Sequence, residues 1–182
     1  MKRPAAKTRR KTRMLTIRPA PLDRCQAILQ FGPLRLRAAL GRSGIASQKR
    51  EGDGATPRAT MPLLKAFHRV DRNVNARSAM PLKVIRDNML WCDAPGHAAY
   101  NRMVRAPFAP SHETMTRVDH LYDICIVLDW NVSSRRRNAG SAIFFHLAKP
   151  GYPPTEGCVA IAPKDMCRLL PHLSRNTRLR VP

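Results

Sequence analysis

Two residues near the C-terminal end of the chain have the chemistry of a nucleophile and its base. His146 closes the apolar run 141–146, and Cys158 follows a loop rich in Gly and Pro, with eleven residues between the two. A thiolate is the nucleophile that acyl transfer needs, and a neighbouring imidazole can generate it. A strand, a loop and a return strand would bring the side chains together. We therefore expect Cys158 as nucleophile and His146 as general base and acid, although a cysteine at such a spacing is more often a buried structural residue.

The residues around Cys158 are candidates for supporting roles. Gly157 has no Cβ beside the sulfur, so a substrate carbonyl could approach the backbone closely. The N–H groups of Gly157 and Cys158 are then candidate oxyanion donors. Thr155, Glu156 and Ser141 are candidate substrate-binding residues. A turn hydroxyl is an equal alternative for Thr155, and a turn role is the favoured one for Ser141.

The elements that must position these residues are short strands. Alternating or continuous apolar residues bounded by Gly and Pro predict strands at 15–18, 27–31, 34–38, 61–67, 81–85, 120–130, 142–147 and 178–181. A helix is predicted from Pro163 through residue 175, kinked or split at Pro171. Many strands with one or two short helices predict a mainly β fold, a sandwich or a barrel.

The organisation along the chain predicts one domain. Residues 1–13 carry seven basic residues and no acid, and we expect a flexible basic tail followed by a single domain over 14–182. Residues 41–57 are predicted to form a turn-rich loop, and residues 87–117 an irregular excursion packed on the domain. No apolar run is long enough to span a membrane, and no apolar segment typical of a signal peptide follows the tail.

Charge and cysteine content narrow the function classes. The formal net charge is +21, from 33 basic and 12 acidic residues, which favours polyanionic partners such as nucleic acid, anionic lipid or an anionic cell-wall polymer. The five cysteines contain no C-x-x-C pair, so neither a zinc ribbon nor a thioredoxin motif is supported. We expect no metal and no cofactor. The odd count fits either five reduced thiols or one free thiol with up to two bridges.

The segment PTEGCVAI, together with the preceding SAIFFHLAKPGY, resembles the active-site segment of the L,D-transpeptidase catalytic-domain family. The family pattern is a His, a loop, Ser or Thr, a variable or His residue, Gly, Cys and a branched apolar residue. Here it maps to His146 and then to the run Thr155–Val159. Upstream, KREGDGATPRATMPL resembles the family's Asp-Gly-x-Thr-Pro segment, and WCDAPGHAAYNRMV and DHLYDICIVLDWN resemble segments of one branch.

Three departures from the family pattern indicate a divergent branch. Glu156 stands where many members have His, Ala160 stands where many have Arg or Asn, and the gap between His146 and Cys158 is shorter than usual. In an extended segment the Glu156 carboxylate would lie beside the Cys158 sulfur and would raise the thiol pKa. We therefore expect Glu156 either to turn away from the sulfur or to bind a substrate ammonium group.

The resemblance implies a cysteine-dependent acyltransferase of peptidoglycan biosynthesis, active in cell-wall biogenesis and cell shape. Its expected partners are peptidoglycan stem peptides and anionic cell-envelope polymers, with no specific nucleic acid and no membrane span. The resemblance also implies a periplasmic or cell-envelope location, and a backbone carbonyl as the third partner of His146. Two alternatives stay open: an L,D-carboxypeptidase on the same scaffold, and a small basic nucleic-acid-binding protein, for which no signature is visible.

Overall fold

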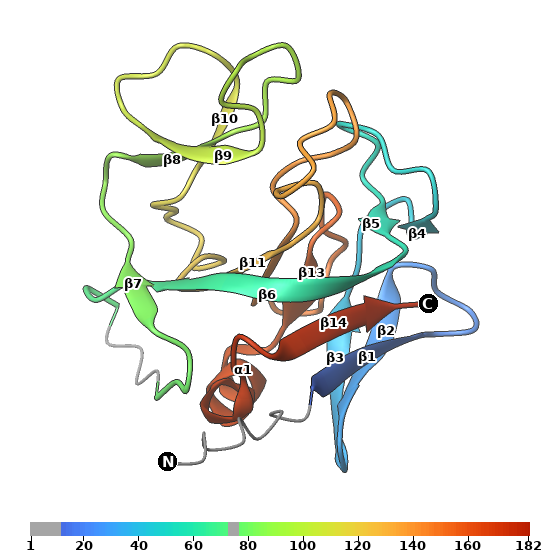
Figure 1. Ribbon diagram of the computed structural model, residues 1–182. Coiled ribbons are helices and arrows are strands. Elements are labelled where there is room, and N and C mark those ends of the chain that lie inside the picture. Colours follow the sequence, from blue (N-terminus) through green and yellow to red (C-terminus); the bar gives the residue numbers. More distant parts are fainter. Residues whose placement is uncertain (1–11, 73–76) are drawn as a thin grey trace, which may run out of the picture.

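The computed structural model describes residues 12–72 and 77–182 and is built mainly of β-strands, which confirms the predicted fold class (Figure 1). The helical part is α1 (Pro163–Leu169) followed by one 3-10 turn, η1 (Leu170–His172). The strands are β1 (Arg13–Pro19), β2 (Gln26–Phe31), β3 (Leu34–Ala39), β4 (Ile45–Ala46), β5 (Thr56–Pro57), β6 (Ala59–His68), β7 (Leu82–Val84), β8 (Met89–Cys92), β9 (Arg102–Arg105), β10 (His112–Thr114), β11 (Ile124–Leu128), β12 (Phe144–Leu147), β13 (Val159–Ile161) and β14 (Thr177–Val181).

Eight of these strands close into a barrel. Their order is β11-β12-β13-β3-β2-β1-β14-β6, and β6 pairs back onto β11 to complete the ring, with β7 added at the edge of β6. Strand β13 lies beside β12 but runs parallel to it. The prediction of a strand that returns in the opposite direction is therefore wrong. The connection 148–158 crosses over and re-enters the sheet in the same direction.

The barrel interior follows from the alternation of each strand. In β3, Leu36 and Ala38 are buried inside, whereas Arg35 and Arg37 point out to solvent. All five residues of β11 are buried because both of its faces are covered. Ile124 belongs to the barrel core, whereas its neighbour Cys125 belongs to a second core on the outside of the barrel.

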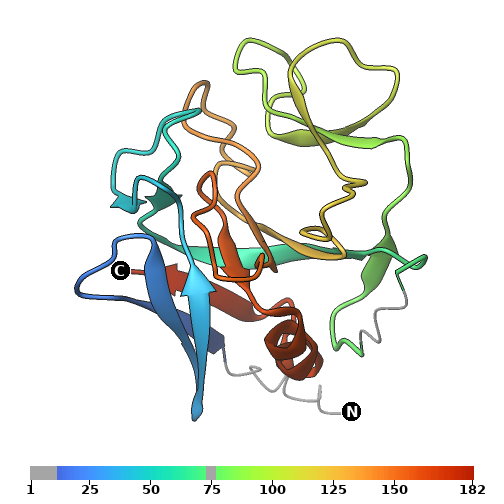
Figure 2. The same ribbon diagram turned by 180° about the vertical axis from the view of Figure 1, so that it is seen from behind.

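That second core lies under an outer layer. Residues 87–117 were expected to be irregular, but they contain the three-stranded sheet β10-β8-β9, which is separate from the barrel sheet and lies at one side of it (Figures 1 and 2). Trp91 of β8 packs edge-on against Phe144 of β12, with ring centroids 5.2 Å apart. The strands have only three or four residues each, too few for a clear period in the sequence.

The helix is split at Pro171 as predicted. Met166, Leu169 and Leu170 are fully buried against the barrel core. Of the predicted tail 1–13, residues 1–11 lie outside the described residues, and Arg13 already belongs to β1. Within residues 12–72 and 77–182, no helix is long and apolar enough to cross a bilayer.

Candidate active site

His146 and Cys158 are brought together by the pairing of two parallel strands. In the register of β12 with β13, His146 lies opposite Ala160. Cys158 comes two residues before Ala160 and therefore lies on the same, outer face of the barrel. Both side chains line one pocket of about 300 Å³ between the barrel and the outer layer. Each is over nine-tenths buried, at 4% exposed for His146 and 7% for Cys158, and the pocket is their route to solvent.

The imidazole of His146 is held in one orientation. Its Nδ1 lies 2.8 Å from the carbonyl oxygen of Leu147, an acceptor, so Nδ1 carries the proton and Nε2 keeps its lone pair. The ring of Tyr122 packs edge-on against it, with centroids 5.3 Å apart. Burial lowers the pKa of His146 to about 4, so the ring is a neutral base at pH 7. Tyr122 was not singled out from the sequence, where it falls within the predicted strand 120–130.

The thiol of Cys158 rests as a neutral group. Its Sγ donates to the carbonyl oxygen of Ala142 at 3.2 Å and accepts from the N–H of Phe144 at 3.3 Å. Burial is the main cause that raises the thiol pKa to about 12. The resting pair is therefore thiol and imidazole, not thiolate and imidazolium, and the proton must leave during the attack on substrate.

Asn101 positions the backbone segment whose carbonyl accepts the hydrogen bond from the Cys158 thiol. It is fully buried; its Oδ1 accepts from the N–H of Ala142 at 3.1 Å and from Trp91 Nε1 at 2.9 Å. Its Nδ2 donates to the carbonyl oxygen of Trp130 at 3.0 Å. This amide thus ties the outer layer to Ala142, two residues before β12.

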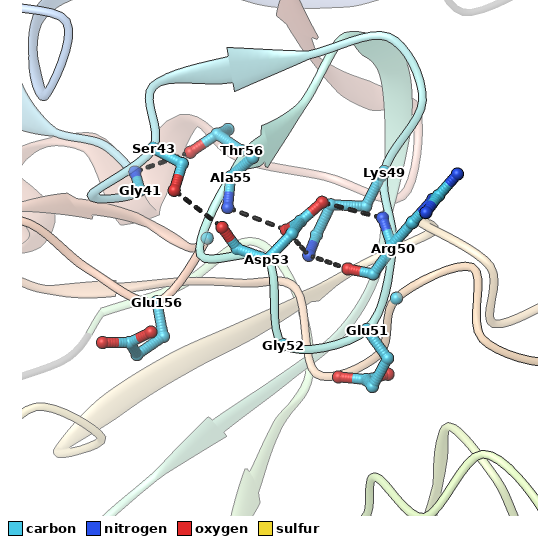
Figure 3. Close-up of polar contacts among 12 residues, drawn as sticks. Gly41, Ser43, Lys49, Arg50, Glu51, Gly52, Asp53, Ala55, Thr56 and Glu156 are labelled. Carbon is cyan, nitrogen blue, oxygen red and sulfur yellow. Dashed lines mark hydrogen bonds and ion pairs between the residues drawn. The ribbon is translucent and has the colours of Figure 1, made fainter.

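The segment that carries Cys158 is clamped by the loop 41–56. Thr155 donates its N–H to Leu40 and accepts at its carbonyl from Arg42, at 2.9 and 2.8 Å. The loop is itself organised around Asp53, whose carboxylate binds the buried Lys49 ammonium and the N–H groups of Arg50 and Ala55 (Figure 3). The family-like Asp-Gly-x-Thr-Pro segment therefore builds the support for the cysteine turn.

Gly157 lies where this support meets the turn. Its φ is +129°, and a Cβ built there would lie 2.7 Å from the carbonyl oxygen of Ala55. Contact with the Ala55 backbone, rather than room for substrate, accounts for the glycine. Its N–H donates to Thr155 Oγ1 at 3.2 Å, and that hydroxyl donates to the Cys158 carbonyl at 2.7 Å, which is the turn role considered for Thr155. The oxyanion role of the Gly157 and Cys158 N–H groups stays a prediction.

Gly157→Ala is expected to destabilise the protein by about 2–4 kcal/mol. The new methyl group meets a backbone oxygen, and the residue must hold a positive φ. The free energy of unfolding from urea titrations measures the effect. Gly96→Ala is the matched control, because its Cβ position is open and its φ is ordinary, and its expected change stays within about 1 kcal/mol. Equal losses for both variants would contradict the proposed clamp.

The charge near the sulfur comes from a different carboxylate than expected. Glu156 turns to Arg42, with an Oε2–Nε distance of 2.8 Å, and both side chains are well exposed. The carboxylate that adds to the raised pKa of Cys158 is Glu113 of β10, which pairs with Arg117. Both carboxylates line the pocket. The expectation that a negative charge opposes thiol activation therefore moves from Glu156 to Glu113.

Glu113→Gln is expected to speed alkylation of Cys158 by iodoacetamide about threefold at pH 8. Removing the carboxylate lowers the thiol pKa, and the remaining Arg117 charge acts in the same direction. Glu156→Gln is the matched control, because its charge is exposed and already paired with Arg42. A faster rate in the Glu156 variant with no change in the Glu113 variant would reverse this assignment.

The remaining candidates lie outside the pocket. Ser141 is buried and does not line the cavity; its Oγ affects the pKa of Tyr100 but forms no hydrogen bond of good geometry.

All five cysteines are described and none is paired. Cys92 and Cys125 are fully buried, and Cys167 is partly buried. Among the described residues, no three His, Cys, Asp or Glu side chains gather in a way that could hold a metal ion.

Comparison with protein families agrees with this geometry. Residues 23–181 match the YkuD family, the L,D-transpeptidase catalytic domain. The chain belongs to this family. The L,D-transpeptidase match covers the barrel strands from β2 onward, the outer layer, and the segment with His146 and Cys158. No curated protein and no solved structure shows significant similarity to the chain.

Two residues near Cys158 that depart from the L,D-transpeptidase family pattern, Ala160 and Glu156, both line the pocket. Ala160 lies opposite His146 and lines the pocket, so a larger side chain at this position would project into the cavity beside the imidazole. Glu156 lies at the pocket rim, where it meets Arg42 of the supporting loop. The divergent branch thus keeps the His and the Cys and changes the walls of the pocket.

Proposed function

We propose that the protein is a cysteine acyltransferase that cross-links peptidoglycan stem peptides. The observation that carries the proposal is that His146 and Cys158 share one pocket, with the imidazole Nε2 left unprotonated by the contact of Nδ1 with Leu147. Family membership supports the same reaction class. The donor is a stem tetrapeptide, and the bond attacked is the one between the L-centre of its diamino acid and the terminal D-Ala.

The reaction runs through a thioester. As Cys158 Sγ attacks the carbonyl carbon, its proton passes to His146 Nε2, and the developing oxyanion is bound by backbone N–H groups. Collapse of the tetrahedral intermediate breaks the peptide bond. The imidazolium then protonates the amine of the leaving D-Ala, and the acyl group stays on the sulfur.

The second half-reaction regenerates the thiol. A side-chain amine of an acceptor stem attacks the thioester, His146 takes the amine proton, and the sulfur leaves to become Cys158 thiol again. The product is a cross-link between two stems. If water attacks instead, the same acyl-enzyme yields a trimmed tripeptide, which is the L,D-carboxypeptidase alternative.

Incubation of the purified protein with a disaccharide-tetrapeptide tests the proposal, with products followed by mass spectrometry. Release of D-Ala together with a dimeric product supports cross-linking. Release of D-Ala with a tripeptide only assigns the protein as the carboxypeptidase. Absence of D-Ala release from this donor would overturn both, and Cys25→Ala, at a partly buried thiol outside the pocket, controls for loss of any cysteine.

A further inference from the structure

The outward face of four neighbouring barrel strands carries only positive charge. Strands β3, β2, β1 and β14 are adjacent in the sheet and contain no Asp or Glu. Five arginines occupy outward, exposed positions on them: Arg18, Arg35, Arg37, Arg178 and Arg180, which we call the arginine face. Among the described residues, none of the five forms an ion pair, although arginines elsewhere in the chain do.

Strand register sets the spacing of these arginines across the four strands. Arg35 lies opposite Gln30, Gln30 opposite Thr16, and Thr16 opposite Arg180, so three strand spacings of roughly 4.8 Å each separate the two arginines. Arg178 lies two residues before Arg180, on the same outward face of β14. An extended chain with a negative charge every few ångströms could therefore contact several of them at once.

The arginine face reaches the rim of the pocket. The guanidinium of Arg37 lies 4.6 Å from the ring centroid of Tyr152, and its Nη2 donates to the carbonyl oxygen of Gly151 at 3.4 Å. Gln26 of β2 donates to the Tyr152 carbonyl at 2.7 Å. Both Gly151 and Tyr152 belong to the connection 148–158, whose flanking residues line the pocket. A polymer lying on the arginine face would thus reach the connection whose residues 153–156 line the pocket.

We propose that the arginine face docks the peptidoglycan sacculus by binding the free carboxylates of its stem peptides. This inference rests on the proposed function, because it makes the docked polymer the same one that enters the pocket. Charge complementarity supports it, since stem peptides carry repeated carboxylates and the face carries no acid of its own. The face holds the insoluble polymer near the pocket, whereas a small soluble donor needs the pocket alone.

Co-sedimentation of the full chain with isolated sacculi tests the docking. The triple variant Arg35→Gln, Arg178→Gln and Arg180→Gln removes three unpaired arginines. The matched control, Arg135→Gln, Arg136→Gln and Arg137→Gln, removes the same charge from an exposed loop. We expect the first variant to weaken binding at least about tenfold and the control less than about threefold. Both should release D-Ala from a soluble disaccharide-tetrapeptide within about twofold of the parent protein.

Three results would overturn the docking. Equal losses of sacculus binding in the two triple variants would mean that the net charge of the protein, and not the arginine face, decides the binding. Undiminished binding to sacculi whose carboxylates have been amidated would remove carboxylates as the partner. Loss of binding to anionic lipid vesicles in the triple variant, with sacculus binding intact, would assign the face to membranes. If the chain binds sacculi through this face but releases no D-Ala, the proposed function fails and the docking stands.

Discussion

Replacing Cys158 with alanine is expected to lower D-Ala release from a disaccharide-tetrapeptide at least about 1,000-fold. The methyl group cannot form the thioester, and Cys158 is the one cysteine of the five that lines the pocket. Mass spectrometry of the intact protein gives a second readout: the acyl adduct expected on the parent protein should be absent from the variant.

The fold should survive this substitution well enough for the comparison to be made. Alanine removes one sulfur and its two weak hydrogen bonds, to Ala142 and Phe144, from a site that opens to the pocket. Cys25→Ala should retain the parent rate within about twofold, because that thiol lies outside the pocket. D-Ala release at the parent rate by the Cys158 variant would end the thioester mechanism.

His146→Gln is expected to reduce kcat/KM for D-Ala release about 100- to 10,000-fold. The amide is similar in size but cannot accept the thiol proton. Because burial lowers the pKa of His146 to about 4, the ring is already a neutral base above that pH. The kcat/KM of the parent protein should therefore be flat from about pH 5 to 8 and should fall only as the pH drops through about 4.

Alkylation of Cys158 gives an independent check on the resting charge of this pair. With the thiol pKa raised to about 12, the thiolate fraction and the alkylation rate should rise about tenfold per pH unit between pH 7 and 10. A thiolate–imidazolium pair would instead give a rate that stays level across pH 5–8. An acid limb near pH 6.5 in kcat/KM, or a level alkylation profile, would contradict the neutral pair.

Local pattern was sufficient for seven of the eight barrel strands, whereas β13 was expected only as a return strand, in the wrong direction. The alternation in 34–38 and the continuous apolar run within 120–130 both predict strands, and the structure has strands at Leu34–Ala39 and Ile124–Leu128. Pro163 and Pro171 likewise predict where the helix begins and where it splits. These strands and helix ends depend on residues that are neighbours in the chain, so they can be predicted from the local sequence pattern.

The outer layer could not be predicted in the same way. Strands β8, β9 and β10 have three or four residues each and pair with one another over distances that no local period records. Their apolar residues cover the outer face of the barrel, and that face carries His146 and Cys158. Glu113, which β10 contributes to the pocket wall, was therefore missed, and so was Tyr122, which lies between β10 and β11.

Residue types and their order in the chain were enough to single out His146 and Cys158 and to predict their family, because nucleophile, base and glycine turn lie within thirteen residues. Tertiary structure decided the charge state of the pair and the carboxylate that acts on the sulfur. Glu156, two residues away, turns to Arg42, whereas Glu113, from a strand far earlier in the chain, acts on the thiol. The physical reason is that burial and Coulomb interactions depend on distance in space, which only the folded barrel and its outer layer set.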